Sequence, residues 1–232
     1  MRFNPLVWLY EFIFPSCCCI CGNPTDAELI CSDCLNDIRF IYPPVCKKCG
    51  RPVNDTDEIC DTCKENPLDI IAIRSVAMHT GVVRRLIHEL KYNNKRKLAQ
   101  ICAEFMSRIL EEDARLKACD SIVPVPLSRT RLRERGYNQA ELIANHIAKI
   151  TEKNLLNVLK RIKHTQAQAN LSRKERIENV REAFVADNKV NGLRIIVIDD
   201  VFTTGSTLNE CAKALYKKGA KEVYGLTFAS AI

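Results

Sequence analysis

The chain has 232 residues, of which 47% are apolar and 27% are charged. This length holds one α/β domain and a small appendage, and this composition excludes long disordered stretches. The net charge of +7 permits a polyanionic ligand without requiring one. No apolar stretch reaches membrane-spanning length, and we find no secretion signal, so we expect a cytoplasmic protein. The apolar segment Leu6–Phe14 predicts a short helix packed on the protein, with membrane-surface contact as the alternative.

Cysteine is the next feature along the chain, with ten of the thirteen cysteines before residue 64. Disulfides are unexpected in a reducing compartment, so metal binding explains them better. Each Cys-x-x-Cys knuckle places two thiolates on one side of a tight turn, and two knuckles complete a tetrahedral zinc site. The four knuckles are Cys18/Cys21, Cys31/Cys34, Cys46/Cys49 and Cys60/Cys63.

The pairing of these knuckles is open at this stage. Sequential pairing makes two small zinc ribbons, whereas a cross-braced arrangement interleaves them. Cys17 and Cys19 are spare thiols, or either replaces a neighbour as a ligand. In both arrangements sulfur fills all four positions, so the zinc should be structural and should supply folding free energy to a segment with little core.

A change in composition near Glu65–Pro67 divides the chain into an N-terminal helix with a double zinc ribbon (1–66) and a second domain (67–232). After this division, apolar runs that predict strands alternate with helical patterns, which favours a parallel sheet with helices on both sides. In chain order we expect a strand at 70–78, helices at 82–90 and 98–109, a strand at 121–125, a helix at 140–150, a strand at 155–159, a short helix opened by a capping box at 172–175, a strand at 195–198, a helix at 208–215 and a strand at 223–228.

The segment that ends the strand at 195–198 carries the clearest functional signal. Ligands of open α/β sheets bind where strands end, and a helix N-terminus offers free N–H groups to a phosphate. Gly205 would let the backbone approach such a ligand closely. A plain strand-to-helix turn with polar caps is the alternative, and the segment is not a Walker A loop. Its candidate ligand-binding residues are Asp199, Asp200, Thr203, Thr204, Gly205, Ser206 and Thr207.

This segment resembles the signature of type I phosphoribosyltransferases. The resemblance implies that Asp199 and Asp200 contact the ribose hydroxyls of 5-phosphoribosyl-1-pyrophosphate, and that residues 203–207 cradle its 5-phosphate. It also implies a Mg²⁺ ion that bridges pyrophosphate and ribose oxygens. Purine-salvage members often have an acid where this chain has Thr203, which argues against purine salvage.

Several further motifs follow the Cys-x-x-Cys knuckles, namely Leu90–Tyr92, Val123–Pro126, Arg135–Gln139, Thr165-x-x-Gln168-x-x-Leu171, and then Arg176, Asn179 and Ala183–Phe184. Together with the knuckles, these motifs resemble those of the ComF family of bacterial competence proteins. The resemblance implies a role in the uptake of transforming DNA, with single-stranded DNA and a DNA-uptake helicase as candidate partners.

Three hypotheses follow from these patterns. In the first, a nucleophile attacks C1 of the ribose and pyrophosphate leaves. Lys91 and the segment Val125–Arg135 would bind the pyrophosphate, with Arg133 and Arg135 supplying the charges. Residues 165–179 would close as a lid with Gln168 and Arg176 nearest the ligand, and the stretch Thr165–Phe184 resembles the mobile loop of glutamine amidophosphoribosyltransferases. In the second, the protein senses the ligand without turnover. In the third, the ribbons and basic face bind single-stranded DNA. The sequence names no acceptor nucleophile.

Overall fold

The computed structural model describes residues 16–25, 28–54, 57–163, 178 and 180–231. The predicted helix at 6–14 lies outside the described residues. The predicted lid, including Gln168 and Arg176, and the capping box at 172–175 lie outside them as well, apart from residue 178.

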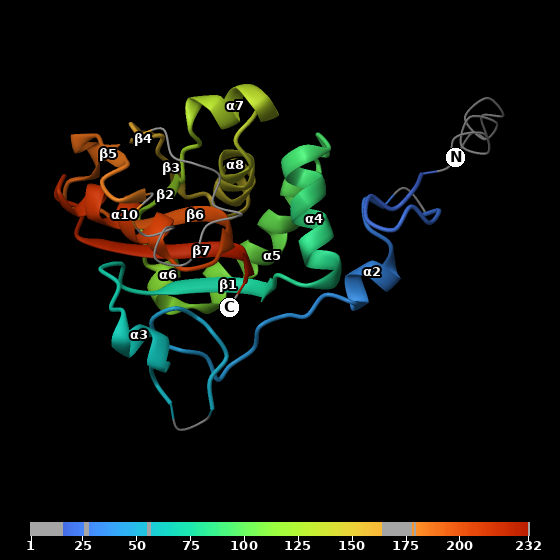
Figure 1. Ribbon diagram of the computed structural model, residues 1–232, viewed down its shortest axis with the longest axis horizontal. Helices are drawn as coiled ribbons and strands as arrows, with labels where there is room; N and C mark the ends of the chain where they lie inside the picture. The colour runs from blue at the N-terminus through green and yellow to red at the C-terminus, as the bar shows by residue number, and fades with distance from the viewer. Residues whose placement is uncertain (1–15, 26–27, 55–56, 164–177, 179, 232) are drawn as a thin grey trace.

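A parallel five-stranded sheet forms the centre of the molecule, with the order β1-β7-β6-β2-β3 (Figure 1). All four neighbouring pairs are parallel, as the alternation of strand and helix predicts. The four apolar residues Ile195–Ile198 of β6 are fully buried, because this strand lies in the middle of the sheet. The strands are β1 (Ile73–Met78), β2 (Ser121–Pro124), β3 (Asn154–Leu155), β6 (Arg194–Phe202) and β7 (Glu222–Ser230).

The predicted strand at 155–159 is wrong as a single element. Its first residue, Leu155, pairs with Ile122 of β2 and ends the main sheet. Its last residue, Leu159, begins β4 (Leu159–Arg161), which pairs antiparallel with β5 (Phe184–Ala186) in a separate two-stranded sheet. The run is apolar apart from Asn157, but its two ends belong to different sheets. A short 3₁₀-helix, η2 (Asn188–Val190), follows β5.

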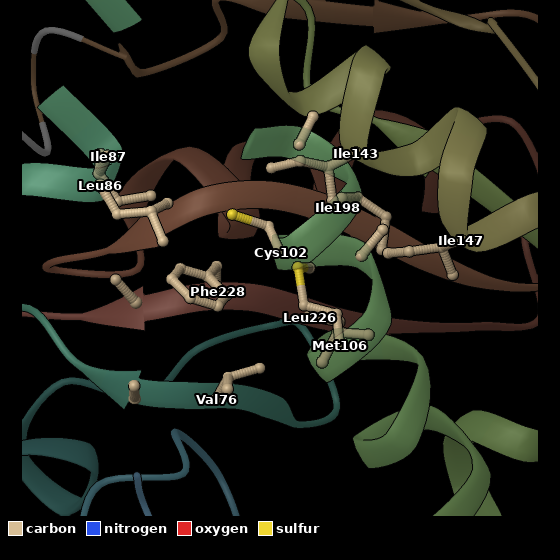
Figure 2. Close-up of a cluster of buried hydrophobic side chains, with 14 of the residues drawn as sticks. Val76, Leu86, Ile87, Cys102, Met106, Ile143, Ile147, Ile198, Leu226 and Phe228 are labelled. Atoms are coloured by element: carbon tan, nitrogen blue, oxygen red, sulfur yellow. The ribbon is translucent and has the colours of Figure 1, made fainter. Parts of the chain in front are cut away.

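Helices cover both faces of the main sheet. One face packs against α4, α5 and α8, and Figure 2 shows this cluster, with Phe228 and Leu226 of β7 and Ile198 of β6 facing Cys102, Met106 and Ile143. The other face packs against α10 and the two-stranded β4–β5 sheet. The helices predicted at 82–90, 98–109, 140–150 and 208–215 are therefore confirmed as α4 (Gly81–Tyr92), α5 (Leu98–Glu112), α8 (Gln139–Thr151) and α10 (Ser206–Tyr216), with α6 (Ala114–Lys117) in addition.

One helix, α7 (Arg129–Arg135), is not among those expected from the sequence. It buries no residue, so it lacks the apolar periodicity by which helices are recognised. Its ends are nonetheless marked in the sequence. The Ser128 hydroxyl accepts a hydrogen bond from the Arg131 N–H, and Gly136, with φ of 74°, closes the helix in the left-handed region.

The segment that joins the two zinc ribbons, and the second ribbon itself, run along the outer edge of β1. The first ribbon contains α2 (Ser32–Asn36), the second contains α3 (Asp61–Glu65), and Figure 1 shows them at separate places along the α/β body. From the joining segment, Arg39 O accepts from Met78 N at 2.8 Å and Ile41 N donates to Val76 O at 2.9 Å. From the second ribbon, Lys48 O accepts from Ile73 N at 2.7 Å. None of the helices in the described part of the chain has the length and apolar character needed to cross a bilayer.

Candidate functional site

The knuckle cysteines form two groups of four, and within each group the sulfur atoms lie within 4.8 Å of one another. Backbone N–H groups of Cys31 and Cys60 donate to the Sγ atoms of Cys18 and Cys46, each at 3.4 Å. Four sulfur donors at such separations fit a structural zinc ion. Sequential pairing is confirmed and the cross-braced alternative is excluded, with Cys17 and Cys19 in neither group. The groups are Cys18, Cys21, Cys31 and Cys34, and Cys46, Cys49, Cys60 and Cys63.

Two adjacent carboxylates stand near the end of β6. Asp200 is 3% exposed, and its N–H donates to Asp199 Oδ1 at 2.9 Å. Burial, and after it the negative charge of Asp200, raise the pKa of Asp199 to about 7. A fold alone gains nothing from two acids in this position, so the pair favours a ligand that hydrogen-bonds to them or a cation that they share.

Lys91 supplies a positive charge to this pair from the last turn of α4. Its Nζ lies 2.8 Å from Asp200 Oδ2. His79, which follows β1, lies beside them, and its pKa is lowered by burial and then by the charge of Lys91. The last turn of α4 and the C-terminal end of β1 therefore bring one lysine and one imidazole to the two carboxylates of β6.

Three arginines lie opposite the carboxylates. Arg131 and Arg135 lie four residues apart on one side of α7, and Arg161 comes from β4. Burial lowers the pKa of Arg161, and the positive charge of Arg131 lowers it further. Two guanidinium groups that repel each other in this way are stabilised when an anion lies between them. Arg133, predicted as a pyrophosphate ligand, has an exposed side chain and does not line the cavity.

The Arg135–Gln139 motif positions the cation of Arg135. Arg135 Nη1 donates to Gln139 Oε1 at 3.0 Å, and its guanidinium lies 4.9 Å from the ring centroid of Tyr92. The Tyr137 hydroxyl donates to Leu90 O, which ties the motif to α4. Asn138 caps α8 through Ala140 N and donates to Val125 O at 2.9 Å. The three sequence motifs around residues 90, 125 and 137 thus meet in one place.

The loop from Thr203 to Thr207 is divided between two cavities. Thr203, Gly205 and Thr207 line the cavity with the carboxylates, whereas Thr204 and Ser206 line a neighbouring one and lie 2.7 Å apart, hydroxyl to hydroxyl. Gly205, with φ of 79°, stands at the N-cap of α10 and offers no capping side chain. The first N–H groups of α10 therefore have no side-chain cap from this position, as an anion site at a helix start requires.

These side chains surround a cavity of about 260 Å³ at the C-terminal edge of the sheet, which we call the basic cavity. Its charged lining consists of four permanent cations, Lys91, Arg131, Arg135 and Arg161, and the two carboxylates Asp199 and Asp200. Sequence reasoning missed Arg161 and His79, and within the segment Val125–Arg135 it singled out Arg133 rather than Arg131. The spacing of Arg131 and Arg135 between a serine cap and a glycine could have indicated their shared face, but no local pattern indicates Arg161.

Comparison with known protein families matches both parts of the chain. Residues 9–64 match the double zinc ribbon domain, and residues 132–230 match the phosphoribosyl transferase domain. Together with the parallel sheet and the two groups of four cysteines, these matches define a protein with a phosphoribosyltransferase fold and an N-terminal double zinc ribbon.

Two relatives and one solved structure illustrate the similarity. Competence protein F of Haemophilus influenzae is 39% identical over 145 residues, which cover 60% of this chain and 63% of that protein, so less than two thirds of it is spanned. DNA utilization protein YhgH of Salmonella typhimurium is 30% identical over 220 residues, covering 90% and 94%. Glutamine phosphoribosylpyrophosphate amidotransferase from B. subtilis matches with a TM-score of 0.42 and 19% identity, over 60% of this chain and 30% of that one. The chain belongs to the ComF family, which includes these competence and DNA utilization proteins.

Proposed function

We propose that the protein binds 5-phosphoribosyl-1-pyrophosphate with Mg²⁺ in the basic cavity and acts in DNA uptake during natural competence. The observation that carries the ligand proposal is the combination of four permanent cations with two strand-end carboxylates around one cavity. The cations suit the phosphates, since each guanidinium donates parallel hydrogen bonds. The carboxylates suit the vicinal hydroxyls of a ribose. The role in competence is supported by the relatives' names and by family membership.

Asp199 and Asp200 also fit Mg²⁺, because carboxylate oxygens are ligands that this ion accepts. The ion would supply charge neutralisation for the pyrophosphate. Without a ligand, the raised pKa of Asp199 favours a proton on its carboxylate, and Asp200 is paired with Lys91. A cation and the ribose hydroxyls would replace these partners.

In a catalytic reaction, a nucleophile would attack C1 of the ribose and pyrophosphate would leave. Lys91, Arg131, Arg135 and Arg161 would stabilise the negative charge that develops on the leaving group. Asp199 and Asp200 would hold the ribose hydroxyls and lie close to the positive charge that develops at C1. Gln139 would keep Arg135 oriented through their 3.0 Å hydrogen bond. The proposed lid residues Gln168 and Arg176 would exclude water.

Calorimetric titration of the purified protein with phosphoribosyl pyrophosphate and Mg²⁺ tests this proposal. Asp200→Asn should weaken binding about tenfold or more, since a charge-assisted hydrogen bond is lost. Glu134→Gln, on the exposed side of α7, removes a carboxylate outside the cavity and should leave binding unchanged. A wild-type protein that does not bind the ligand would overturn the proposal. Release of pyrophosphate in the presence of acceptors then distinguishes an enzyme from a sensor.

Single-stranded DNA is the second candidate ligand, favoured by the outward side of α7. Arg129 and Arg133 are exposed there, whereas Arg131 and Arg135 line the cavity. Phosphate contacts make binding depend on salt, so the slope of log affinity against log salt counts them. Replacing both exposed arginines by alanine should lower this slope by about one for each lost contact. An unchanged slope would remove α7 from the DNA hypothesis.

A further inference from the structure

A second cavity, of about 610 Å³, lies between the second zinc ribbon and α10. Arg51 and Thr62 line it from the ribbon, and Leu68 lines it from the segment that leads to β1. Phe202 and Thr203 line both this cavity and the basic cavity, so the two spaces share one wall. A molecule here would lie next to a ligand bound at Asp199 and Asp200. We call this space the ribbon cavity.

The floor of the ribbon cavity is held by hydrogen bonds to Asn209. Its Oδ1 accepts from the backbone N–H groups of Asp69 and Ile70 at 2.6 and 3.1 Å, and its Nδ2 donates to Asp69 Oδ2 at 3.0 Å. Asn209 is 8% exposed. These hydrogen bonds hold the segment between the second ribbon and β1 against α10. This wall of the cavity is therefore fixed in place.

The charge of the ribbon cavity is opposite to that of the basic cavity. Three carboxylates line it, and Lys213 lies 2.8 Å from Glu210 and 3.6 Å from Asp69, so these charges largely offset one another. Cys49 and Cys63 also line the cavity, and a zinc ion with four thiolates carries two net negative charges. A negative potential rejects anions and accepts uncharged or cationic molecules. The charged side chains are Glu65, Asp69 and Glu210, with Arg51 and Lys213.

We propose that the ribbon cavity binds the acceptor of phosphoribosyl transfer, and that this acceptor is an uncharged or cationic nitrogen nucleophile. The inference rests on the proposed function of the basic cavity. The volume is typical of small-molecule sites. Pro67, Leu68, Phe202 and Ala231 offer apolar walls for a flat body, while the hydroxyls of Thr204 and Ser206 offer hydrogen bonds.

The proposed transfer reaction needs no further reactant. A bond forms between the acceptor nitrogen and C1 of the ribose, the bond between C1 and the pyrophosphate oxygen breaks, and pyrophosphate keeps the electron pair. The proton displaced from the nitrogen passes to solvent. The second zinc ribbon thereby becomes part of the substrate site, although its metal takes no part in the bond changes.

Ligand-observed NMR with a fragment library tests the proposal. The library holds equal numbers of amines, uncharged nitrogen heterocycles and carboxylates, and each is tested against the full-length zinc-loaded protein with and without phosphoribosyl pyrophosphate and Mg²⁺. Ala231→Trp fills the ribbon cavity, and its backbone bond from Ala231 N to Phe202 O at 2.8 Å can remain. Ala118→Trp, at an exposed position that lines neither cavity, is the matched control.

We expect amines and uncharged heterocycles among the binders, carboxylates to be excluded, and binding to be lost in Ala231→Trp alone. Glu65→Lys should weaken the cationic binders about tenfold and leave the uncharged ones unaffected. Binders that are mostly carboxylates, binders that survive Ala231→Trp, or a library with no binder would each overturn the inference. Because the fragments are also tested without phosphoribosyl pyrophosphate, and binding of that ligand is measured separately, failure of the proposed function is distinguishable from failure of this one.

Discussion

Lys91 and Asp200 form an ion pair of 2.8 Å between α4 and the end of β6, and their side chains are only 19% and 5% exposed. In a buried ion pair, each charge offsets part of the cost of removing the other from water. In the proposed complex, phosphate oxygens would replace Asp200 as the partner of Lys91, and ribose hydroxyls would replace Lys91 as the partner of Asp200. The pair therefore links the stability of the empty site to its affinity for ligand.

Lys91→Met should destabilise the protein by about 3 kcal/mol, because it leaves the buried Asp200 carboxylate without its cation. The double variant Lys91→Met with Asp200→Asn should recover much of this loss, since no unpaired charge remains. Urea unfolding measures both, and Lys149→Met, on the exposed side of α8, is the control. Equal losses in the single and double variants would show that the ion pair is not what the single variant breaks.

Arg131→Ala should weaken binding of phosphoribosyl pyrophosphate by about tenfold to a hundredfold, the value of one lost charge-assisted contact. Arg133→Ala, two residues away on the exposed side of the same helix, should have little effect. Calorimetry of the two variants gives a direct comparison at equal net charge. The reverse order of effects would mean that α7 rotates when ligand binds and that Arg133 is the pyrophosphate residue.

Asp199 should make the empty protein less stable as pH rises. Burial and the charge of Asp200 put its pKa at about 7 in the folded state, above the ordinary aspartate value near 4. The folded protein then holds this proton between about pH 4 and 7 where the unfolded chain does not, so stability is lost as pH rises through this window. The free energy of unfolding is measured in urea for the wild type and for Asp199→Asn at about pH 5 and pH 8. The wild type should lose stability relative to the variant between the lower and the higher pH. A constant difference between the two proteins would contradict a raised pKa.

The two zinc sites should differ in their effect on ligand binding. We expect about two zinc ions per chain by elemental analysis, and one after either Cys34→Ser or Cys63→Ser. Cys34→Ser should unfold the first ribbon and leave the α/β domain and its ligand binding intact. Cys63→Ser should also weaken ligand binding, because the second ribbon leads through Leu68 to the phosphate loop. Equal ligand affinity in the two variants would show that the second ribbon does not affect the phosphate loop.

Gly205→Ala should cost more stability than Gly192→Ala, although both residues have similar positive φ angles, 79° and 75°. Each substitution adds about 1 kcal/mol of backbone strain. At Gly205 the new Cβ would also lie 2.9 Å from Phe202 and 3.3 Å from Leu68, whereas nothing lies within 4 Å at Gly192. Thermal unfolding and ligand calorimetry of both variants check this. Loss of ligand binding in Gly192→Ala would argue for a global rather than a local cause.

The sequence predicts the sheet and its helices well because their apolar residues repeat with the periods of buried strands and helices. Ile195–Ile198 and the face of α5 are examples. It fails at residues 155–159, where one apolar run serves two sheets, since the sequence does not show which partner each residue pairs with. It also misses α7, which buries nothing and is defined only by its caps.

The candidate site divides in the same way. Asp199, Asp200 and the following loop are contiguous, so a strand-to-helix signature reveals them. Arg161 and His79 come from β4 and the end of β1, and only the folded chain brings them to the carboxylates. The zinc ligands were predictable because spacing within each knuckle fixes the chemistry, although their pairing needed the fold. The division of the chain near residue 66 stays a prediction.

The hydrogen bonds that Arg39, Ile41 and Lys48 make to β1 have a consequence for the behaviour of shortened chains. A polypeptide that began at Pro67 would lose these partners, and the outer side of β1 would present unpaired N–H and C=O groups. It would also uncover Ile73, now fully buried beside the second ribbon. Bare strand edges of this kind recruit other strands. The ribbon region therefore protects this strand edge from pairing with a second molecule. The shortened chain should precipitate or form oligomers in which the sheets of different molecules pair edge to edge.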